Sequence, residues 1–509
     1  MRKKLTTFIK DNYKYLLFSL IFLAVNSFFV LRLRDFVGGW KVLMLAGLLV
    51  VQIALCVLCF WLKKTKKWQH HQLFLLFSIV IGLIFVFAMP PGSAPDEPNH
   101  FRRAYEVSEG KIISARENGN EGEGGNILPN SINEIFGPGP LDIKYRDMPD
   151  AVNKSNQETG EGFQNFGNTA LYSPIVYLPQ ATGTLVGRIL HLPMIVVFYL
   201  ARIFNLAFWI LLGYYAIKKI PFGKNVLLLI LFLPISMQAA ASCQADAITN
   251  VSAIALFAFV LSKIKNPSKL TNKELAVGGI LAFIVSMSKI VYLPLCFLLL
   301  LIPKKCFKNK KEKLLKIGGL LLAIVVINMI WLVISAGFLV EFREGVNSGE
   351  QVKYILTNPI KYLMTVGATI VEKGTFYFFT FFGSLLGHFN IGLAEPYILF
   401  LAFFIIYTFF QENKKDYTLS TAQKVGFFVI ALICTGLIFT SIYVQWTAVR
   451  SPIIEGIQGR YFIPLALPIL FLLNPISNQS KKDHDLFVFS MIAAISVYML
   501  TSVIAFYMV

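Results

Sequence analysis

The sequence has little charge for its length. Only 15% of its 509 residues are Asp, Glu, Lys or Arg, whereas 56% are hydrophobic. A typical soluble domain carries about 25% charged residues, which it needs to cover its surface. The scarcity of charge therefore excludes an ordinary soluble protein. The hydrophobic residues also form runs of about 15 to 25, the length that crosses roughly 30 Å of hydrocarbon, so we predict an integral membrane protein.

Cysteine is scarce as well, and the longest polar segment has none. The six cysteines lie in or beside hydrophobic runs, and segment 90–192 contains no cysteine. This excludes a disulfide framework for that segment, and the spacing of Cys56 and Cys59 indicates packing rather than redox chemistry. No small-residue cleavage pattern follows the first hydrophobic run, so we predict a retained first helix instead of a signal peptide.

Lys and Arg outnumber Asp and Glu, 47 to 28, but they do not form a surface for nucleic acid. They cluster in short links between hydrophobic runs, as at 63–67 and 304–316, and no polar segment interleaves them with aromatic residues. We therefore expect no nucleic-acid partner.

Lysine-rich links mark the cytoplasmic side of a membrane protein. Segment 90–192 has 8 basic and 13 acidic residues, so we predict that it lies on the outer side.

The hydrophobic runs predict an all-α fold of about thirteen transmembrane helices, with a cytoplasmic N-terminus and an outer C-terminus. Segment 274–303 has lysine-rich links on both sides, so we predict two short helices, 274–287 and 290–303, that meet at Ser288-Lys289. The other eleven helices are predicted at 15–31, 40–62, 72–89, 193–217, 225–241, 247–264, 317–339, 395–410, 425–444, 460–474 and 485–508.

Three outer regions connect these helices. The first, 90–192, contains a Gly-, Asn- and Glu-rich stretch at 117–126 that we predict to be mobile. Its apolar end, 172–190, suits a helix that lies along the membrane interface. The second region, 340–394, has an aromatic patch at 376–382, and the third is the short loop 445–459. We predict three parts: two additional N-terminal helices in 1–70, a catalytic module in 71–475 and a C-terminal helix in 476–509.

Polar residues at five places on the predicted outer side are candidates for chemistry. They are Asp96, Glu97, His100, Arg102 and Arg103 after the third helix, Arg202 in the fourth, Asp246 between the fifth and sixth, Lys289 at the turn in 274–303, and Arg460 with Tyr461 at the start of 460–474.

The pair Asp96-Glu97 is the candidate for proton transfer. Pro95 and Pro98 hold the pair in a stiff turn, because each proline fixes its own φ and biases its predecessor to an extended conformation. A carboxylate at the membrane surface beside His and Arg suits a general base that takes a proton from a hydroxyl. The alternative is that Asp96 or Glu97 only caps the helix that follows.

The cations are candidates for binding a phosphate. Arg202, inside a predicted span, faces a polar cavity or a charged partner, and Asp246 is the obvious partner. Lys289 at an outer turn and Arg460 beside aromatic residues suit a phosphate with an apolar tail. The alternatives are cations that extend to the lipid headgroups and, for Asp246, a simple loop acid. Together the candidates fit sugar transfer from a lipid-phosphate donor.

Several motifs together resemble an uncharacterised family of bacterial multi-pass membrane proteins over residues 70–475. That family is in turn similar to the GT-C glycosyltransferases, which include protein mannosyltransferases and the lipid A aminoarabinose transferase. The motifs are Pro95-Asp-Glu-Pro-Asn-His100 with the following Arg-Arg-Ala-Tyr105, Tyr172-Ser-Pro174 with Tyr177-Leu-Pro179, Arg202 with Asn205, Gln244-Ala-Asp246, and Gln458-Gly-Arg-Tyr-Phe-Ile-Pro464.

The resemblance implies a GT-C-like fold that works at the outer face of the bacterial cytoplasmic membrane. Asp96 matches the catalytic base of such enzymes, and Asp246 matches a second acid. Arg202, Lys289 and Arg460 match cations that hold the phosphate of a polyprenyl-phosphate sugar. Enzymes with these donors generally need no metal, so we expect no metal or other cofactor, with a divalent cation as the open alternative. The two helices before residue 70 depart from the usual plan.

The sequence therefore predicts an inverting glycosyltransferase whose partners are a lipid-phosphate donor, a surface or cell-wall glycan or glycolipid acceptor, and membrane lipids. Asp96 deprotonates the acceptor, and Glu97 and His100 orient Asp96 or the acceptor. Arg460 stabilises the leaving phosphate together with Lys289, with Arg102 or Arg202 as a further candidate. One alternative is a polysaccharide polymerase or ligase with a pyrophosphate-linked donor. Others are a transporter or flippase, whose charged residues lie near the bilayer midplane, and a non-catalytic membrane scaffold.

Overall fold

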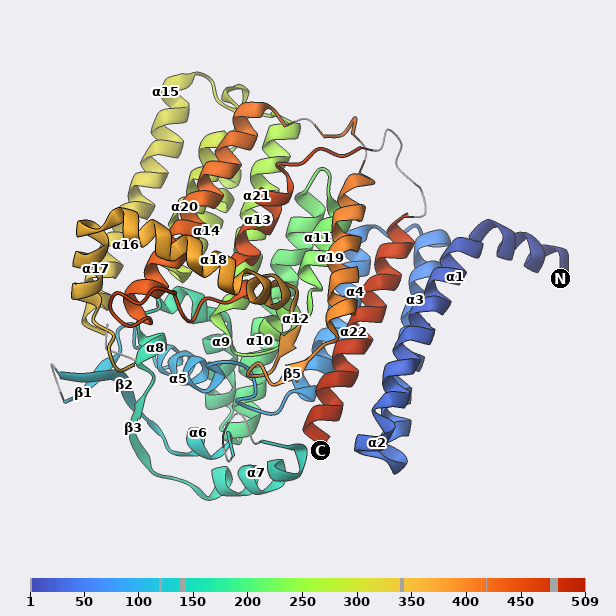
Figure 1. The fold of residues 1–509 in the computed structure, drawn as a ribbon, viewed down its shortest axis with the longest axis horizontal. Coiled ribbons are helices and arrows are strands. Elements are labelled where there is room, and N and C mark those ends of the chain that lie inside the picture. The colour runs from blue at the N-terminus through green and yellow to red at the C-terminus, as the bar shows by residue number, and fades with distance from the viewer. Residues whose placement is uncertain are drawn as a thin grey trace.

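The computed structural model describes residues 2–118, 121–137, 139, 143–338, 343–412, 414–417, 419–476 and 484–508. Most of this chain is helical, and long helices run side by side (Figure 1). Within these ranges, eight helices are long and apolar enough to cross a membrane. The prediction of an α-helical membrane protein is therefore confirmed, whereas the number of thirteen helices and the GT-C-like arrangement stay predictions.

The eight long helices agree with the predicted runs. They form because an apolar stretch without interior proline can satisfy its backbone hydrogen bonds internally in lipid. They are α1 (Arg2–Arg32), α3 (Gly39–Lys64), α4 (His70–Ala88), α10 (Met194–Lys219), α13 (Ala245–Lys265), α20 (Thr421–Gln445), α22 (His484–Met508) and a continuous helix made of α15 (Lys310–Lys313), η5 (Leu314–Gly318), α16 (Gly319–Ser335) and η6 (Ala336–Phe338). Short α2 (Arg34–Val37) joins α1 to α3, and α19 (Glu395–Phe410) is a shorter apolar helix.

Prolines divide two of the predicted runs. Run 225–241 consists of α11 (Lys224–Leu231) and α12 (Pro234–Ala240), and run 460–474 consists of η7 (Gly459–Leu465) and α21 (Ala466–Leu470). Proline lacks the N–H that an interior helical position donates. Pro234 therefore begins a new helix, and Pro464 lies within a 3₁₀ segment.

Segment 274–303 is two helical pieces, as predicted. They are α14 (Asn272–Ser288) and η3 (Ile290–Leu301), and a short turn, η4 (Lys304–Cys306), follows. Lys289, between the two pieces, has an extended backbone with φ −150° and ψ 128°. The break takes Lys289 out of any continuous helix and lets its side chain reach Asp246 at the start of α13.

The first outer region contains a small sheet as well as helices. Its strands β1 (Ala115–Asn118), β2 (Glu121–Pro129) and β3 (Glu161–Asn165) form an antiparallel sheet in that order. The described residues of 117–126 belong to β1 and β2, and 119 and 120 lie outside the described residues, so the predicted mobility of this stretch stays a prediction. The helices of the region are α5 (Glu97–Ser108), α6 (Ser131–Glu134), η1 (Tyr145–Asp147), α7 (Met148–Gln157), α8 (Gly167–Ala170), η2 (Pro174–Tyr177) and α9 (Leu178–Ile189).

The predicted interfacial segment 172–190 is helical, and α9 packs closely on α10. A methyl group at Gly183 would lie 2.4 Å from the carbonyl oxygen of Leu200, so only glycine allows this approach. The outward-facing Leu178, Leu185 and Ile189 are exposed. These contacts fix the end of the first outer region against the membrane helices.

The second outer region contains α17 (Ser348–Thr357), the amphipathic α18 (Pro359–Phe382) and a hairpin of β4 (Leu385–Leu386) and β5 (Ile391–Gly392). Helix α18 lies across the long helices in Figure 1. Its side chains Leu363, Met364 and Val371 are more than half exposed, which suits a helix at the membrane interface.

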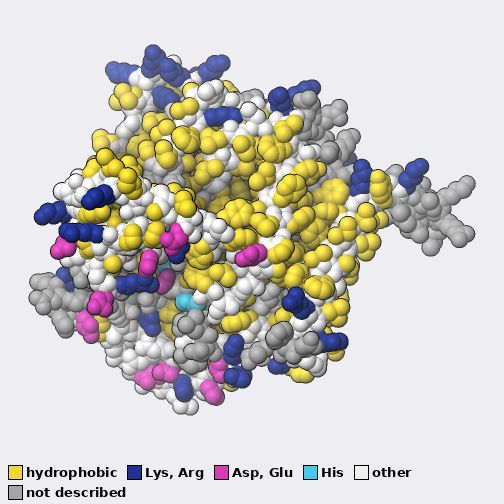
Figure 2. All heavy atoms as spheres, in the orientation of Figure 1, with side chains coloured by type: hydrophobic (Ala, Val, Ile, Leu, Met, Phe, Trp, Pro, Cys, Tyr) yellow, Lys and Arg dark blue, Asp and Glu magenta, His cyan; other side chains and the backbone are white. Residues whose placement is uncertain are grey.

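The two ends of the molecule differ in character. The lysine-rich α15 lies at one end of the long helices, and the sheet β1–β3 lies toward the other (Figure 1). Lys and Arg side chains gather at the α15 end, whereas Asp and Glu side chains are seen toward the sheet (Figure 2). The helices between these ends carry mostly hydrophobic surface (Figure 2).

The N-terminal pair α1 and α3 packs on the C-terminal helix α22. Asn26 of α1 donates to Gln52 of α3 at 2.8 Å and to the Ala494 carbonyl of α22 at 2.9 Å. Lys63 pairs with Asp485 at 2.7 Å. The two additional helices and the C-terminal helix thus form one group beside the rest of the bundle.

Candidate functional site

Asp96 lies at the N-cap of α5 and is exposed. Its φ is 58°, in the left-handed region that a non-glycine residue rarely adopts. A residue held there costs about 1–3 kcal/mol and persists only where its surroundings enforce it, often at functional sites. One carboxylate oxygen accepts a hydrogen bond from Asn168 at 3.2 Å, and Asn99 holds Asn168 at 2.8 Å. Asp96 is therefore a fixed carboxylate that solvent and ligands can reach.

Glu97, adjacent to Asp96, is fully buried. Its carboxylate binds Arg202 through two hydrogen bonds of 2.8 and 2.7 Å. It also accepts from the backbone N–H of Cys243 at 2.9 Å and of Gly92 at 3.1 Å. With four donors around it, Glu97 fixes the turn 90–97 rather than facing a ligand.

Arg202 is the buried partner of Glu97, so the predicted pairing of Arg202 with Asp246 is wrong. Its remaining N–H groups donate to the backbone at the end of α4, to the carbonyls of Val86, Met89 and Pro90. Arg202 lies within α10. Sequence spacing gives only its approximate depth in the membrane, so any acid at a similar depth is a possible partner. The acid that reaches it is Glu97, because the turn after α4 folds back onto α10.

Arg102 and Arg103 tie α5 to the rest of the first outer region. Arg102 donates to Gln164, Asn99 and Asn133 at 2.9, 2.8 and 2.8 Å. Arg103 is fully buried and pairs with Glu106. Its other contacts are Ser114 and the carbonyls of Ile112 and Tyr172. Both side chains thus bind within the region, although Nε of Arg103 has no hydrogen-bond partner among the described residues.

Asp246, Lys289 and Arg460 meet, although the chain separates them widely. Asp246, in the first turn of α13, lies 2.6 Å from the Lys289 ammonium and 3.4 Å from Arg460. Lys289 also lies over the rings of Tyr172 and Tyr461, 5.4 and 5.0 Å from their centroids. Two cations against one acid leave this cluster with a net positive charge.

Arg460 has unused hydrogen-bonding capacity. The side chain is buried, and among the described residues its Nε and Nη1 atoms have no hydrogen-bond partner. Buried donors are nearly always hydrogen-bonded, and the contact of Nε with Asp246 at 3.4 Å is an ion pair without a hydrogen bond, so these two donors in a positive cluster indicate a place for an anion. The cluster of Asp246, Lys289 and Arg460 is hereafter called the cation cluster.

His100 interacts electrostatically with Asp96 and with all three residues of the cation cluster. Its Nδ1 atom is 2.8 Å from the Tyr177 hydroxyl, and its ring stacks on Tyr172. Burial lowers the pKa of His100 from 6.5 to about 4, although Asp96 interacts with it and acts in the opposite direction. Arg460 also interacts electrostatically with Asp96. His100 is therefore neutral near pH 7, and Asp96 faces the same region as the cations.

The burial of His100 predicts a pH-dependent stability. Its pKa is lower in the folded state, about 4, than the unfolded value of 6.5, so the unfolded state binds the proton first as the pH falls. The contribution of His100 to the free energy of unfolding is complete above pH 6.5, and between pH 6.5 and pH 4 it decreases by on the order of 3 kcal/mol. Thermal unfolding in detergent between pH 4 and 8 should give a flatter profile for His100→Gln than for the wild type. Identical slopes would contradict this assignment.

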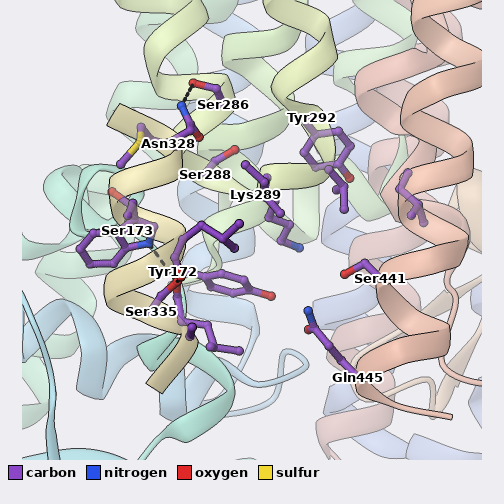
Figure 3. A pocket seen from close by; sticks show the side chains of 18 of the residues that line it. Tyr172, Ser173, Ser286, Ser288, Lys289, Tyr292, Asn328, Ser335, Ser441 and Gln445 are labelled. Atoms are coloured by element: carbon purple, nitrogen blue, oxygen red, sulfur yellow. Dashed lines mark hydrogen bonds between the residues drawn. The ribbon is translucent and has the colours of Figure 1, made fainter. Parts of the chain in front are cut away.

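A groove leads from the cation cluster toward the lipid-facing surface. Its cavity has a volume of about 180 Å³ and runs between the end of α14, the start of η3, α16 and α20. Lys289 extends into it, with Ser441 and Gln445 of α20 on one side and Ser335 of α16 on the other (Figure 3). Asn328 and Ser286 pair with each other at 3.0 Å, so the remaining wall is largely apolar. Helices α16 and α20 are otherwise mostly exposed and apolar, so the groove faces lipid.

Sequence reasoning missed two residues near Asp96. Asn168 is one of several Asn in a polar loop, and His388 is an isolated histidine in the β4–β5 hairpin; neither stands in a recognisable motif. His388 interacts electrostatically with Asp96 and is hydrogen-bonded to the backbone of Gly92 and Ala94. Among the residues that the structure describes, no group of three or more His, Cys, Asp or Glu side chains could hold a metal ion.

A family model described as "Predicted membrane protein (DUF2142)" matches residues 77–469. No curated protein and no solved structure matches the chain. The matched part begins in α4 and ends in α21, so it contains every candidate residue. The prediction of a family of multi-pass membrane proteins over most of the chain is confirmed. The similarity of that family to GT-C glycosyltransferases stays a prediction.

Proposed function

The chain belongs to the DUF2142 family of predicted membrane proteins, and we propose that it transfers a sugar from a polyprenyl-phosphate donor to a hydroxyl of a surface or cell-wall glycan. One observation carries the proposal. The cation cluster lies at the end of a largely apolar groove that Lys289 lines. Within the described ranges, Nε and Nη1 of its buried Arg460 have no hydrogen-bond partner, and Arg460 interacts electrostatically with the exposed Asp96 carboxylate.

The donor has three parts that match three parts of the site. Its isoprenoid chain is apolar and suits the groove between α16 and α20. Its phosphate is an anion and suits Arg460 and Lys289, of which Arg460 has free donors. Its sugar would then lie toward Asp96 and His100. We therefore propose that the phosphate binds at the cation cluster, with Tyr461 beside it.

In the proposed reaction, Asp96 takes the proton of the acceptor hydroxyl. The hydroxyl oxygen forms a bond to the anomeric carbon, and the bond from that carbon to the phosphate oxygen breaks. Its electron pair goes to the leaving lipid phosphate, whose charge increases from about −1 toward −2. Arg460 and Lys289 stabilise this charge. The acceptor attacks opposite to the phosphate, so the anomeric configuration inverts, and Asp96 then releases its proton to water.

The buried residues have positioning roles in this proposal. Glu97 and Arg202 fix the turn that holds Asp96 in its left-handed conformation. Arg102 holds α5 against β3 through Gln164, and Arg103 holds it against the segment that follows through Ile112 and Ser114. Asp246 holds the two cations at one place and lowers their mutual repulsion. We propose that the site faces the outer side and the lysine-rich α15 end faces the cytoplasm of a bacterial cell, in keeping with the distribution of Lys and Arg.

The test of this function is a transfer assay with purified protein in lipid nanodiscs. A panel of radiolabelled polyprenyl-phosphate sugars is supplied, and the release or transfer of label is measured, with analysis of the lipid product. We expect turnover of at least one donor and release of a lipid monophosphate. Release of a lipid pyrophosphate would instead favour a polymerase or ligase. Movement of intact lipid across the membrane without release of sugar would favour a flippase.

Arg460→Gln is expected to weaken the binding of polyprenyl monophosphate by about 10–100-fold, since a charged hydrogen bond contributes about 1.5–3 kcal/mol. Glutamine keeps a polar side chain of similar length but has no charge. The measurement is lipid binding in nanodiscs by native mass spectrometry. Arg343→Gln is the matched control, because Arg343 is half exposed and pairs with Glu455. Equal affinities of the two variants would place the phosphate elsewhere.

A further inference from the structure

The β4–β5 hairpin holds His388 in a fixed position. The strand pairs Leu385 with Gly392 and Leu386 with Ile391 close the hairpin. Within its turn, Phe389 has a φ of 65°, a rare conformation for a large side chain. Gln238 of α12 fixes the turn, because it accepts from the N–H of Gly387 at 2.7 Å and donates to the carbonyl of Gly387 at 3.4 Å.

This rigid turn brings His388 to the loop that carries Asp96. The imidazole is hydrogen-bonded to the backbone of Gly92 and Ala94, and it interacts electrostatically with the carboxylates of Asp96 and Glu97. Burial lowers the pKa of His388, and the two carboxylates act in the opposite direction. Its Nε2 atom is buried and has no hydrogen-bond partner within the described ranges. A buried polar atom that has no partner in the protein usually forms its hydrogen bond with a ligand or a water molecule.

His388 differs from the other histidine near Asp96. The Nδ1 atom of His100 is hydrogen-bonded to Tyr177 and its ring stacks on Tyr172, so neighbouring side chains hold this imidazole in place. Glu97 is enclosed by Arg202 and two backbone donors. Asp96 supplies an exposed carboxylate, and His388, about 290 positions later in the chain, supplies an imidazole whose Nε2 atom has no hydrogen-bond partner among the described residues. A neutral imidazole offers one donor and one acceptor.

We propose that Asp96 and His388 form the acceptor side of the site, where His388 hydrogen-bonds a hydroxyl of the incoming glycan. This inference rests on the proposed function. If the donor phosphate lies at the cation cluster, the nucleophile must approach from the opposite side of the sugar, where Asp96 is available. A glycan carries neighbouring hydroxyls, so His388 can bind one while Asp96 deprotonates another. His388 thereby selects hydroxyl-rich acceptors over water.

The test separates acceptor binding from donor binding. His388→Ala and His388→Gln are compared with the wild type in nanodiscs, with transfer to a glycan acceptor, hydrolysis of the donor by water, and binding of polyprenyl monophosphate as readouts. We expect His388→Ala to raise the acceptor KM at least about 10-fold, with donor binding and hydrolysis within about twofold of the wild type. Glutamine should restore part of the loss, because its amide can also bond a hydroxyl.

His71→Ala is the control, since His71 packs on Tyr214 at the opposite end of α4 and should leave every readout unchanged. An unchanged acceptor KM in His388→Ala would overturn the assignment of His388 alone. A loss of donor binding in both His388 variants would also overturn it, because it would show that the hairpin supports the whole site. A wild-type protein that transfers no sugar from any lipid-phosphate donor would overturn the proposed function and this inference with it.

Discussion

Asp96→Asn is expected to reduce sugar transfer at least about 10³-fold, while the protein still inserts, folds and binds the donor. A general base contributes about 10²–10⁴-fold, and an amide cannot take the proton. Asparagine has the size of aspartate and, like it, tolerates the left-handed backbone observed at this position. The substitution also keeps an oxygen that can accept from Asn168. The loss should therefore be chemical and not structural.

The measurement is the single-turnover rate of transfer in nanodiscs, together with donor affinity and the unfolding temperature. Asp150→Asn is the matched control, because Asp150 is an exposed carboxylate in α7 of the same outer region. We expect kcat to fall and the donor affinity to stay within about twofold in Asp96→Asn, as for a group that acts in the transition state. Near-normal turnover in this variant would remove Asp96 as the base.

Arg202→Met is expected to lower the free energy of unfolding by about 3–5 kcal/mol, because it leaves the Glu97 carboxylate charged, buried and without its cation. The carbonyls at the end of α4 would lose their donors as well. Arg202→Met/Glu97→Gln should recover part of this loss, since no unpaired charge remains. Both variants should transfer sugar poorly when folded, because the turn that holds Asp96 loses its anchor.

Unfolding in denaturant and mild detergent, followed by tryptophan fluorescence, measures these differences. Arg343→Met should change stability by less than about 0.5 kcal/mol, since its partner Glu455 is exposed and surface pairs contribute little. An Arg202→Met variant as stable as Arg343→Met would show that the Glu97–Arg202 pair does not hold the turn.

Much of the fold was predictable because membrane length and charge distribution are strong constraints. The helix positions follow from apolar runs that must satisfy their own hydrogen bonds in lipid. Lysine-rich links on both sides of 274–303 predicted the break at Lys289, and that break is what brings Lys289 to Asp246. The convergence of Lys289 and Arg460 at Asp246 was predictable in outline, because all three lie at the same predicted side.

The remaining details depend on contacts that sequence spacing does not report. The described part of 117–126 forms strands because Gly124 and Gly125 let β2 lie against its neighbours, where a methyl group at Gly125 would come within 2.2 Å of the Gln164 carbonyl oxygen. A glycine-rich composition gives no sign of such a close approach. The choice of Glu97 over Asp246 as the partner of Arg202 depends on how the turn after α4 folds. His388 lies near Asp96 only because Gln238 fixes its hairpin.

The structure of the Asp96→Asn variant, determined with a polyprenyl-phosphate sugar bound, tests the central claim most directly. We expect the lipid phosphate within hydrogen-bond distance of Arg460 and Lys289, the isoprenoid chain between α16 and α20, and the anomeric carbon facing position 96. A phosphate bound elsewhere, or a sugar that faces away from position 96, would contradict the account.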